Sequence, residues 1–143
     1  MRLVLDTNTV ISGLIWSGSP SQLIDAALLR QIQLINNAAL LSELHDVILR
    51  SKFIKPLQHR KLDANDLFEG YAALVTIVPN ITIVPTILAD PSDDQVLAAA
   101  LSGKADFIVS GDDRHVTPLG SFEGIRIVNA KDAVDLINRL LTK

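Results

Sequence analysis

Short apolar runs that alternate with segments of helical periodicity constrain the fold of this chain most strongly. Five runs have the length and branching of buried strands, namely residues 3–5, 32–35, 81–84, 107–109 and 125–128. Apolar residues at helical spacing predict five helices. They begin after the turn at 17–20, after the N-cap Asn37 and at residue 63; a fourth runs through Val96 and ends at Gly103, and the last covers 131–141. This alternation predicts an α/β fold with a central, mostly parallel five-stranded sheet flanked by helices on both faces.

Composition limits the size and setting of the protein. With 143 residues, the chain is expected to form one domain, residues 1–143, around a core of aliphatic side chains. Absence of cysteine excludes disulfides and thiolate metal sites and favours a reducing, cytoplasmic location. Residues 70–89 carry no charge, but the prolines and threonines among them predict a helix end, a strand and a loop, so no membrane span is expected.

Four acidic residues follow strands or begin the helices after them. Asp6 and Asp112 come after the first and fourth strands, Glu43 lies early in the helix after the second strand, and Asp94 lies in the first turn of the helix after the third. In parallel βαβ units the carboxyl ends of the strands and the starts of the helices share one edge of the sheet. We therefore expect these four acids to meet there.

Several ionised carboxylates in one cleft require a counter-charge. Two unit charges ~4 Å apart repel by roughly 4 kcal/mol at an effective dielectric constant near 20. Oxygen ligands without Cys or a paired His suit Mg²⁺ or Mn²⁺, as one or two ions per site. Such an ion lowers the pKa of a bound water and neutralises charge on phosphorus oxygens, so the cluster favours phosphodiester hydrolysis.

Four short motifs occur along the chain, in the order Leu5-Asp6-Thr7-Asn8, Ser42-Glu43-Leu44, residues 90–98 and residues 108–112. They resemble the four motifs of PIN-domain ribonucleases, in particular the VapC-like branch of toxin components of prokaryotic toxin–antitoxin systems. The resemblance implies cleavage of single-stranded or structured RNA with Mg²⁺ or Mn²⁺, and an antitoxin protein as partner. It implies Asp6, Glu43, Asp94 and Asp112 as catalytic, metal-binding acids, with Asn8 and Ser110 as supporting polar groups.

One position departs from the family pattern. Many members carry a further acid two residues after the fourth motif acid, where this chain has Arg114. The number of metal ions therefore stays open. An alternative function is that of a catalytically impaired PIN-like module that binds RNA or protein. A third is an aspartate-nucleophile phosphatase, although Asn8 stands where that mechanism needs an acid.

A polyanionic substrate needs cationic contacts, yet the formal net charge is −3. The chain has one basic block, which consists of Arg50, Lys52, Lys55, Arg60 and Lys61. Arg114 is a further cation beside the fourth motif. These residues are candidate phosphate contacts, although a solvated loop is the alternative for the block. It follows the Glu43 helix and so has to fold back, or reach across a dimer, to approach the acids.

Apolar content suggests that part of the surface is covered. The mean hydropathy of +0.32 is high for a small monomer and predicts a homodimer. Trp16 and Phe53 are interpreted as core or dimer contacts rather than as platforms for base stacking.

Overall fold

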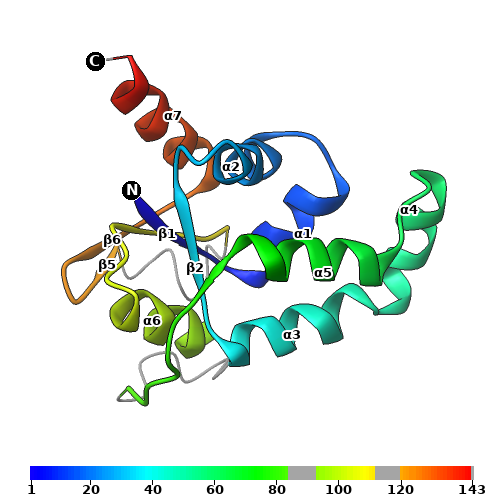
Figure 1. Cartoon of the computed structure of the whole chain (residues 1–143), viewed down its shortest axis with the longest axis horizontal. Helices are drawn as coiled ribbons and strands as arrows, with labels where there is room; N and C mark the ends of the chain where they lie inside the picture. The colour runs from blue at the N-terminus through cyan, green and yellow to red at the C-terminus, as the bar shows by residue number, and fades with distance from the viewer. Residues whose placement is uncertain (84–92, 112–119, 143) are drawn as a thin grey trace.

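The computed structural model of the protein describes residues 1–83, 93–111 and 120–142. Its centre is a six-stranded sheet in the order β3-β2-β1-β4-β6-β5 (Figure 1). The strands are β1 (Arg2–Leu5), β2 (Gln33–Asn36), β3 (Thr76–Ile77), β4 (Phe107–Val109), β5 (Ser121–Phe122) and β6 (Ile125–Val128). Neighbouring strands pair in parallel except β5, which is antiparallel to β6. The predicted α/β class and mostly parallel sheet are confirmed.

Two details of the predicted sheet are wrong. The sheet has six strands rather than five, because the two-residue β5 was not expected. The third strand lies at Thr76–Ile77, pairing with Ile35 and Asn36, whereas residues 81–83 have no regular structure and residue 84 lies outside the described residues. Both runs contain β-branched residues, and β2 pairs with the one that directly follows a helix. Local β propensity alone does not predict which of the two runs pairs with β2.

The helices are α1 (Thr7–Ile15), α2 (Ser19–Leu28), α3 (Ala38–Ile48), the 3₁₀ turn η1 (Ser51–Phe53), α4 (Ile54–His59), α5 (Ala64–Leu74), α6 (Asp93–Ser102) and α7 (Ala130–Leu141). The five helices expected from periodicity are present, whereas α1 was not expected because its threonines and β-branched residues are weak helix formers. Among the helices in the described ranges, none is long and apolar enough to cross a membrane.

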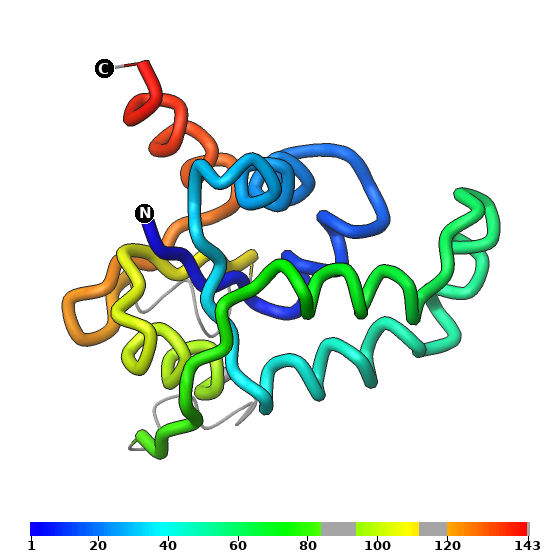
Figure 2. Tube along the Cα trace, in the orientation of Figure 1, coloured from blue at the N-terminus to red at the C-terminus, as the bar shows by residue number. Residues whose placement is uncertain are grey.

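Alternate residues of β1 start two cores on opposite faces of the sheet. Leu3 and Leu5 belong to a cluster that includes buried residues of α1, α2, α3, α5 and α7. Val4 belongs to a second cluster built mainly with α6. Helices therefore cover both faces, as predicted. Figure 2 shows α3 and α5 running side by side away from the sheet, with α4 at their far end.

The end of α6 depends on a close approach between helix and sheet. Gly103 follows the last residue of α6, as expected, but it does not have the positive φ that usually places glycine after a helix. Lys104 has that conformation, with φ 52°. A Cβ atom at Gly103 would instead overlap the Ile35 side chain on β2. Glycine is needed here because α6 packs directly on the sheet.

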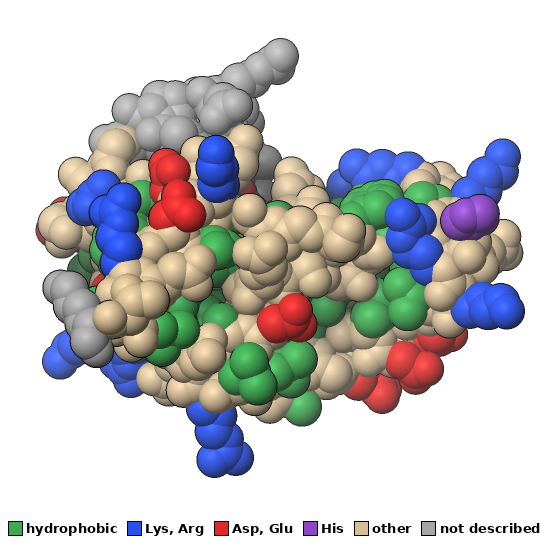
Figure 3. All heavy atoms as spheres, turned by 90° about the horizontal axis from the view of Figure 1, so that it is seen from above, with side chains coloured by type: hydrophobic (Ala, Val, Ile, Leu, Met, Phe, Trp, Pro, Cys, Tyr) green, Lys and Arg blue, Asp and Glu red, His purple; other side chains and the backbone are tan. Residues whose placement is uncertain are grey.

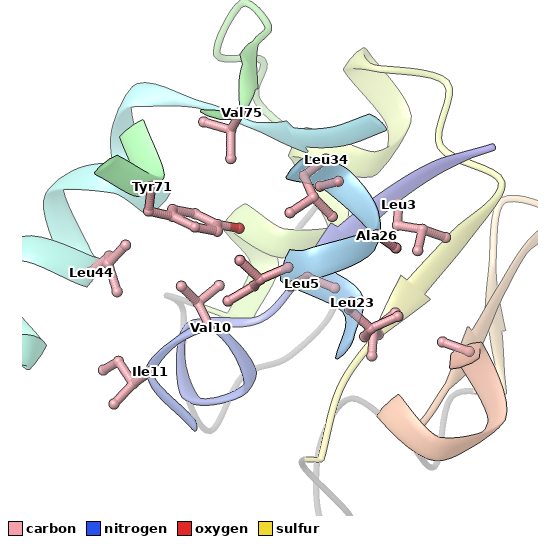
Figure 4. Packing of buried hydrophobic residues seen from close by; sticks show 14 of the residues in the cluster. Leu3, Leu5, Val10, Ile11, Leu23, Ala26, Leu34, Leu44, Tyr71 and Val75 are labelled. Atoms are coloured by element: carbon pink, nitrogen blue, oxygen red, sulfur yellow. The ribbon is translucent and has the colours of Figure 1, made fainter. Parts of the chain in front are cut away.

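Tyr71 of α5 places a phenol inside the first core. Figure 4 shows Leu5, Val10 and Tyr71 pointing toward one another. The Tyr71 side chain is buried, and its hydroxyl lies beside Asn36 without a hydrogen bond of regular geometry. Burial raises the pKa of the Tyr71 phenol, and the neighbouring Asn36 side chain offsets part of that rise.

This raised pKa predicts a loss of stability in alkali. The unfolded phenol releases its proton above about pH 10 while the folded one keeps it, so the free energy of unfolding should fall by about 1.4 kcal/mol per pH unit above pH 10 and be unaffected by this group below pH 10. Tyr71→Phe should remove that slope. Urea unfolding of both proteins between pH 8 and 11 measures it, and equal slopes would contradict the prediction.

Candidate active site

Asp6 is a buried carboxylate at the carboxyl end of β1, between β2 and β4 in the sheet. Only 6% of the residue is exposed. It is the N-cap of α1, where Oδ1 accepts a hydrogen bond of 2.8 Å from the backbone N–H of Thr9. An acceptor at this position satisfies a free N–H of the first turn, and a negative charge there is favoured by the helix dipole. The same residue therefore ends the strand and starts the helix.

Ser110 connects the ends of three parallel strands. It is fully buried after β4, and its backbone N–H donates to the carbonyl of Val128 on β6 at 3.0 Å. Its hydroxyl donates to Oδ2 of Asp6 at 2.6 Å. Both oxygens of the Asp6 carboxylate are thus held by donors. Asn8, expected beside Asp6 as a second supporting group, has an exposed side chain on the first turn of α1.

Glu43 approaches the same edge of the sheet from α3. Its Oε2 accepts a hydrogen bond of 2.6 Å from the Thr7 hydroxyl, and Thr7 directly follows Asp6. The start of α3 is set by Asn37, whose side chain accepts from the backbone N–H of Leu40 at 2.8 Å. The sequence interpretation did not single out Thr7, although the signal was present as a hydroxyl next to the first motif acid.

Asp94 is the third described acid of the predicted site. It lies in the first turn of α6 and is 9% exposed, and α6 packs on β1, β2 and β4. The fourth acid, Asp112, and the nearby Arg114 lie outside the described residues. The structure therefore joins Asp6 to Ser110 and Glu43 to Thr7, and it buries Asp94 at the start of the helix that covers these strands.

The oxygen chemistry of this edge suits a hard divalent ion. A carboxylate has about four lone-pair directions, of which the hydrogen bonds above use two on Asp6 and one on Glu43. Lone-pair directions on the Asp6 and Glu43 carboxylates therefore remain for a cation such as Mg²⁺ or Mn²⁺. Within residues 1–83, 93–111 and 120–142, however, no three acidic or histidine side chains come close enough to hold a metal ion.

The basic block forms η1 and α4 at the end of the molecule remote from α7. Figure 3 shows Lys and Arg side chains gathered over this end. Arg60 lies over the Trp16 ring, 5.6 Å from its centroid, and Lys52 lies 5.1 Å from the Phe53 centroid. Phe53 is buried, as expected of a core residue. Trp16 is not a core residue, because 37% of it is exposed, and the alternative that it is a dimer contact stays a prediction. The block thus contacts the far end of α1, which begins at Asp6.

The fold and these carboxylates define an α/β protein that presents acids at the carboxyl edge of a parallel sheet. The chain belongs to the PIN-domain family, because the model of the PIN domain matches residues 2–114. PIN domains are generally nucleases and typically depend on divalent metal ions.

Solved structures share the fold at low sequence identity. One is VapBC2 from Rickettsia felis bound to a DNA fragment from their promoter, with 13% identity, a TM-score of 0.60, and coverage of 90% of this chain and 98% of that chain. Another is FitAcB from Neisseria gonorrhoeae, with 18% identity, a TM-score of 0.48 and the same coverage. No curated protein matches the sequence.

Proposed function

We propose that this protein is a metal-dependent endoribonuclease that hydrolyses phosphodiester bonds of single-stranded RNA. The observation that carries the proposal is the buried Asp6 carboxylate, which is held by Thr9 and Ser110 at the carboxyl end of an interior strand. Burying a carboxylate costs free energy unless hydrogen bonds or a bound cation compensate its charge. Because the chain belongs to the PIN family, whose members typically depend on divalent metal ions, we assign this carboxylate to metal binding.

In this proposal the four motif acids hold Mg²⁺ or Mn²⁺, as one or two ions; they are Asp6, Glu43, Asp94 and Asp112. The bound ion supplies an activated water and neutralises charge on the scissile phosphate. The residues of this chain orient the ligands, because Ser110 and the Thr9 amide hold Asp6 in one rotamer and Thr7 holds Glu43. Asn8 is exposed on the first turn of α1, and in this proposal its side chain contacts the substrate.

Two kinds of comparison support a role as the toxin of a toxin–antitoxin pair. The four motifs resemble the VapC-like branch, and VapBC2 shares the fold over 90% of this chain. We propose that residues 1–143 form one PIN-like nuclease domain of the cytoplasm, whose acidic cleft is closed by an antitoxin protein. Two results would support this partner. The protein should copurify with the product of a neighbouring gene, and RNA cleavage should be inhibited only when that product is present.

Cleavage should require a divalent ion and the motif acids. Asp6→Asn, Asp94→Asn and Asp112→Asn should each lower the rate of RNA cleavage in Mn²⁺ by roughly 100-fold or more, because each removes a ligand charge. Asn at position 6 still offers an oxygen to the Thr9 amide, so α1 keeps its cap and the variant should stay folded. Asp135→Asn, an exposed acid on α7, is the matched control and should cleave normally.

Three results would redirect this assignment. Full cleavage in EDTA, or by the Asp6→Asn protein, would exclude a metal nuclease at this site. RNA binding without cleavage in Mg²⁺ or Mn²⁺ would support the impaired PIN-like module. Hydrolysis of a phosphomonoester, with RNA left intact, would support the phosphatase.

We further propose that cations of the basic block, together with Arg114, contact phosphates of the substrate. Lys52 and Lys55 are exposed on η1 and α4. Replacing both with Ala should flatten the slope of log K against log salt for single-stranded RNA by up to about 0.7 per lost contact. A matched double variant of exposed cations on α7, Lys131→Ala with Arg139→Ala, should keep the slope. An unchanged slope in the first variant would exclude Lys52 and Lys55 as phosphate contacts and leave Arg114 and the remaining cations of the block.

A homodimer remains our proposal for the apolar surface. Leu28 and Leu29 at the end of α2 are 62% and 70% exposed, and Leu140 and Leu141 on α7, which packs against α2, are 51% and 52% exposed. Exposed leucines at this density favour burial against a partner. Light scattering at micromolar concentration should give twice the chain mass, and Leu29→Glu should shift it toward the monomer. A monomeric wild-type chain would exclude the dimer.

A further inference from the structure

The surface around Trp16 combines an exposed aromatic ring with cations. Trp16 is the C-cap of α1 and is 37% exposed, although its ring contacts the buried Phe53 at a centroid distance of 6.4 Å. Arg60, the C-cap of α4, lies over the ring at 5.6 Å. The Trp16 ring therefore contacts Phe53 at an interplanar angle of 59° and has the Arg60 guanidinium over it, while 37% of the residue remains exposed to solvent.

The neighbouring surface of α4 is open and basic. A shallow depression of about 600 Å³ is lined by Lys55, Pro56, Gln58, His59 and Arg60. Lys52 lies 5.1 Å from the centroid of Phe53, the ring that contacts Trp16. No acidic residue occurs between Val47 and Leu62 in the sequence, so this stretch contributes cations alone. A ligand here is expected to be an anion that also offers a flat apolar face.

We propose that Trp16 is a stacking platform for one base of single-stranded RNA, with Arg60 and Lys52 contacting the adjacent phosphates. Sites for single-stranded nucleic acid combine these two elements, a basic path along the backbone and an aromatic ring for the base. Arg60 suits the task because its guanidinium is already held against the ring and still presents donors to a phosphate. This inference rests on the proposed ribonuclease function and adds a substrate subsite remote from the acids.

The position of Trp16 relative to Asp6 fits one continuous substrate. Asp6 and Trp16 cap the two ends of α1, which has 9 residues. At ~1.5 Å rise per residue, the helix separates them by roughly 15 Å. About four stacked nucleotides at ~3.4 Å each cover that length, and an extended strand needs fewer. The base on Trp16 would therefore belong to a nucleotide a few positions from the scissile phosphate.

A protein partner at this surface is the competing occupant, and the charge distribution favours RNA. A second copy of this chain carries a formal net charge of −3, but its own block is equally basic, so two such surfaces repel if they face each other across a twofold axis. RNA presents a negative charge at every nucleotide and a π face at every base. It is complementary to both components of the surface.

The chain contains one tryptophan, so its fluorescence reports directly on this site. Titration of the wild-type protein with a short single-stranded oligoadenylate in EDTA should quench Trp16 emission, because no metal is present to support cleavage and the stacked base contacts the ring. A duplex RNA of the same length should quench much less at equal occupancy, because its bases are already stacked. Unchanged emission at saturating single-stranded RNA, or equal quenching by the duplex, would overturn the proposal.

Variants separate stacking from charge. Trp16→Ala should weaken binding of labelled single-stranded RNA roughly tenfold and leave the salt slope unchanged, and Trp16→Phe should recover most of the affinity. Arg60→Ala should instead flatten the salt slope by about 0.7. Leu101→Ala is the matched control, because Leu101 near the end of α6 is an apolar residue that is 39% exposed, and it should bind as wild type. Circular dichroism checks that each variant is folded, and Trp16→Phe preserves the contact with Phe53 if Trp16→Ala unfolds.

The outcomes distinguish this subsite from the nuclease itself. Cleavage in Mn²⁺ by wild type, with equal RNA affinity in the Trp16→Ala and wild-type proteins, would remove the subsite and keep the nuclease. Quenching without any cleavage would keep the subsite and remove the nuclease. Emission that changes with protein concentration in the absence of RNA, together with a monomeric Trp16→Ala protein, would assign Trp16 to a dimer contact and overturn the proposal.

Discussion

The Asp6 carboxylate is the interaction on which the arrangement of this site depends. Its two oxygens accept from the Thr9 amide and the Ser110 hydroxyl, so one buried charge caps α1 and joins the ends of β1 and β4. Hydrogen bonds to a charged group contribute about 1.5–3 kcal/mol each, which offsets the cost of removing that charge from water. The same two hydrogen bonds therefore define where α1 starts, hold the ends of β1 and β4 together and orient the Asp6 carboxylate.

The interior position of β1 explains why this part of the sheet is closely packed on both faces. Its alternate side chains enter two separate cores, Leu3 and Leu5 on one face and Val4 on the other. On the second face α6 lies close enough that Gly103 has no room for a Cβ atom against Ile35. Asp94 is carried by the same helix, so the packing that excludes a side chain at Gly103 also determines where that acid lies. Close packing of α6 thus places a candidate ligand.

α1 connects the buried Asp6 carboxylate to the basic surface around Trp16. Its first residue follows the buried acid, and its last turn leads to Trp16, over which the Arg60 guanidinium lies. The pair formed by α3 and α5 carries that basic end away from the sheet, and Glu43, in the middle of α3, accepts the hydrogen bond from Thr7. An acidic protein can in this way keep carboxylates and cations apart, while both remain within the length of a short RNA strand.

The sequence alone determined the α/β class, the parallel strands, most helices and the acids at strand ends, because hydrophobic period and capping are local properties. Periodicity did not reveal α1, since Thr7 and Thr9 form a helix only where Asp6 caps it. Nor did it place β3, because pairing with Ile35 and Asn36 selected Thr76–Ile77 over the equally branched residues 81–84. The hydrogen bond from Thr7 to Glu43 and the contact of Arg60 with Trp16 join residues 36 and 44 positions apart. Only the tertiary structure decides such contacts, because they depend on how α1, α3 and α4 pack rather than on any local pattern.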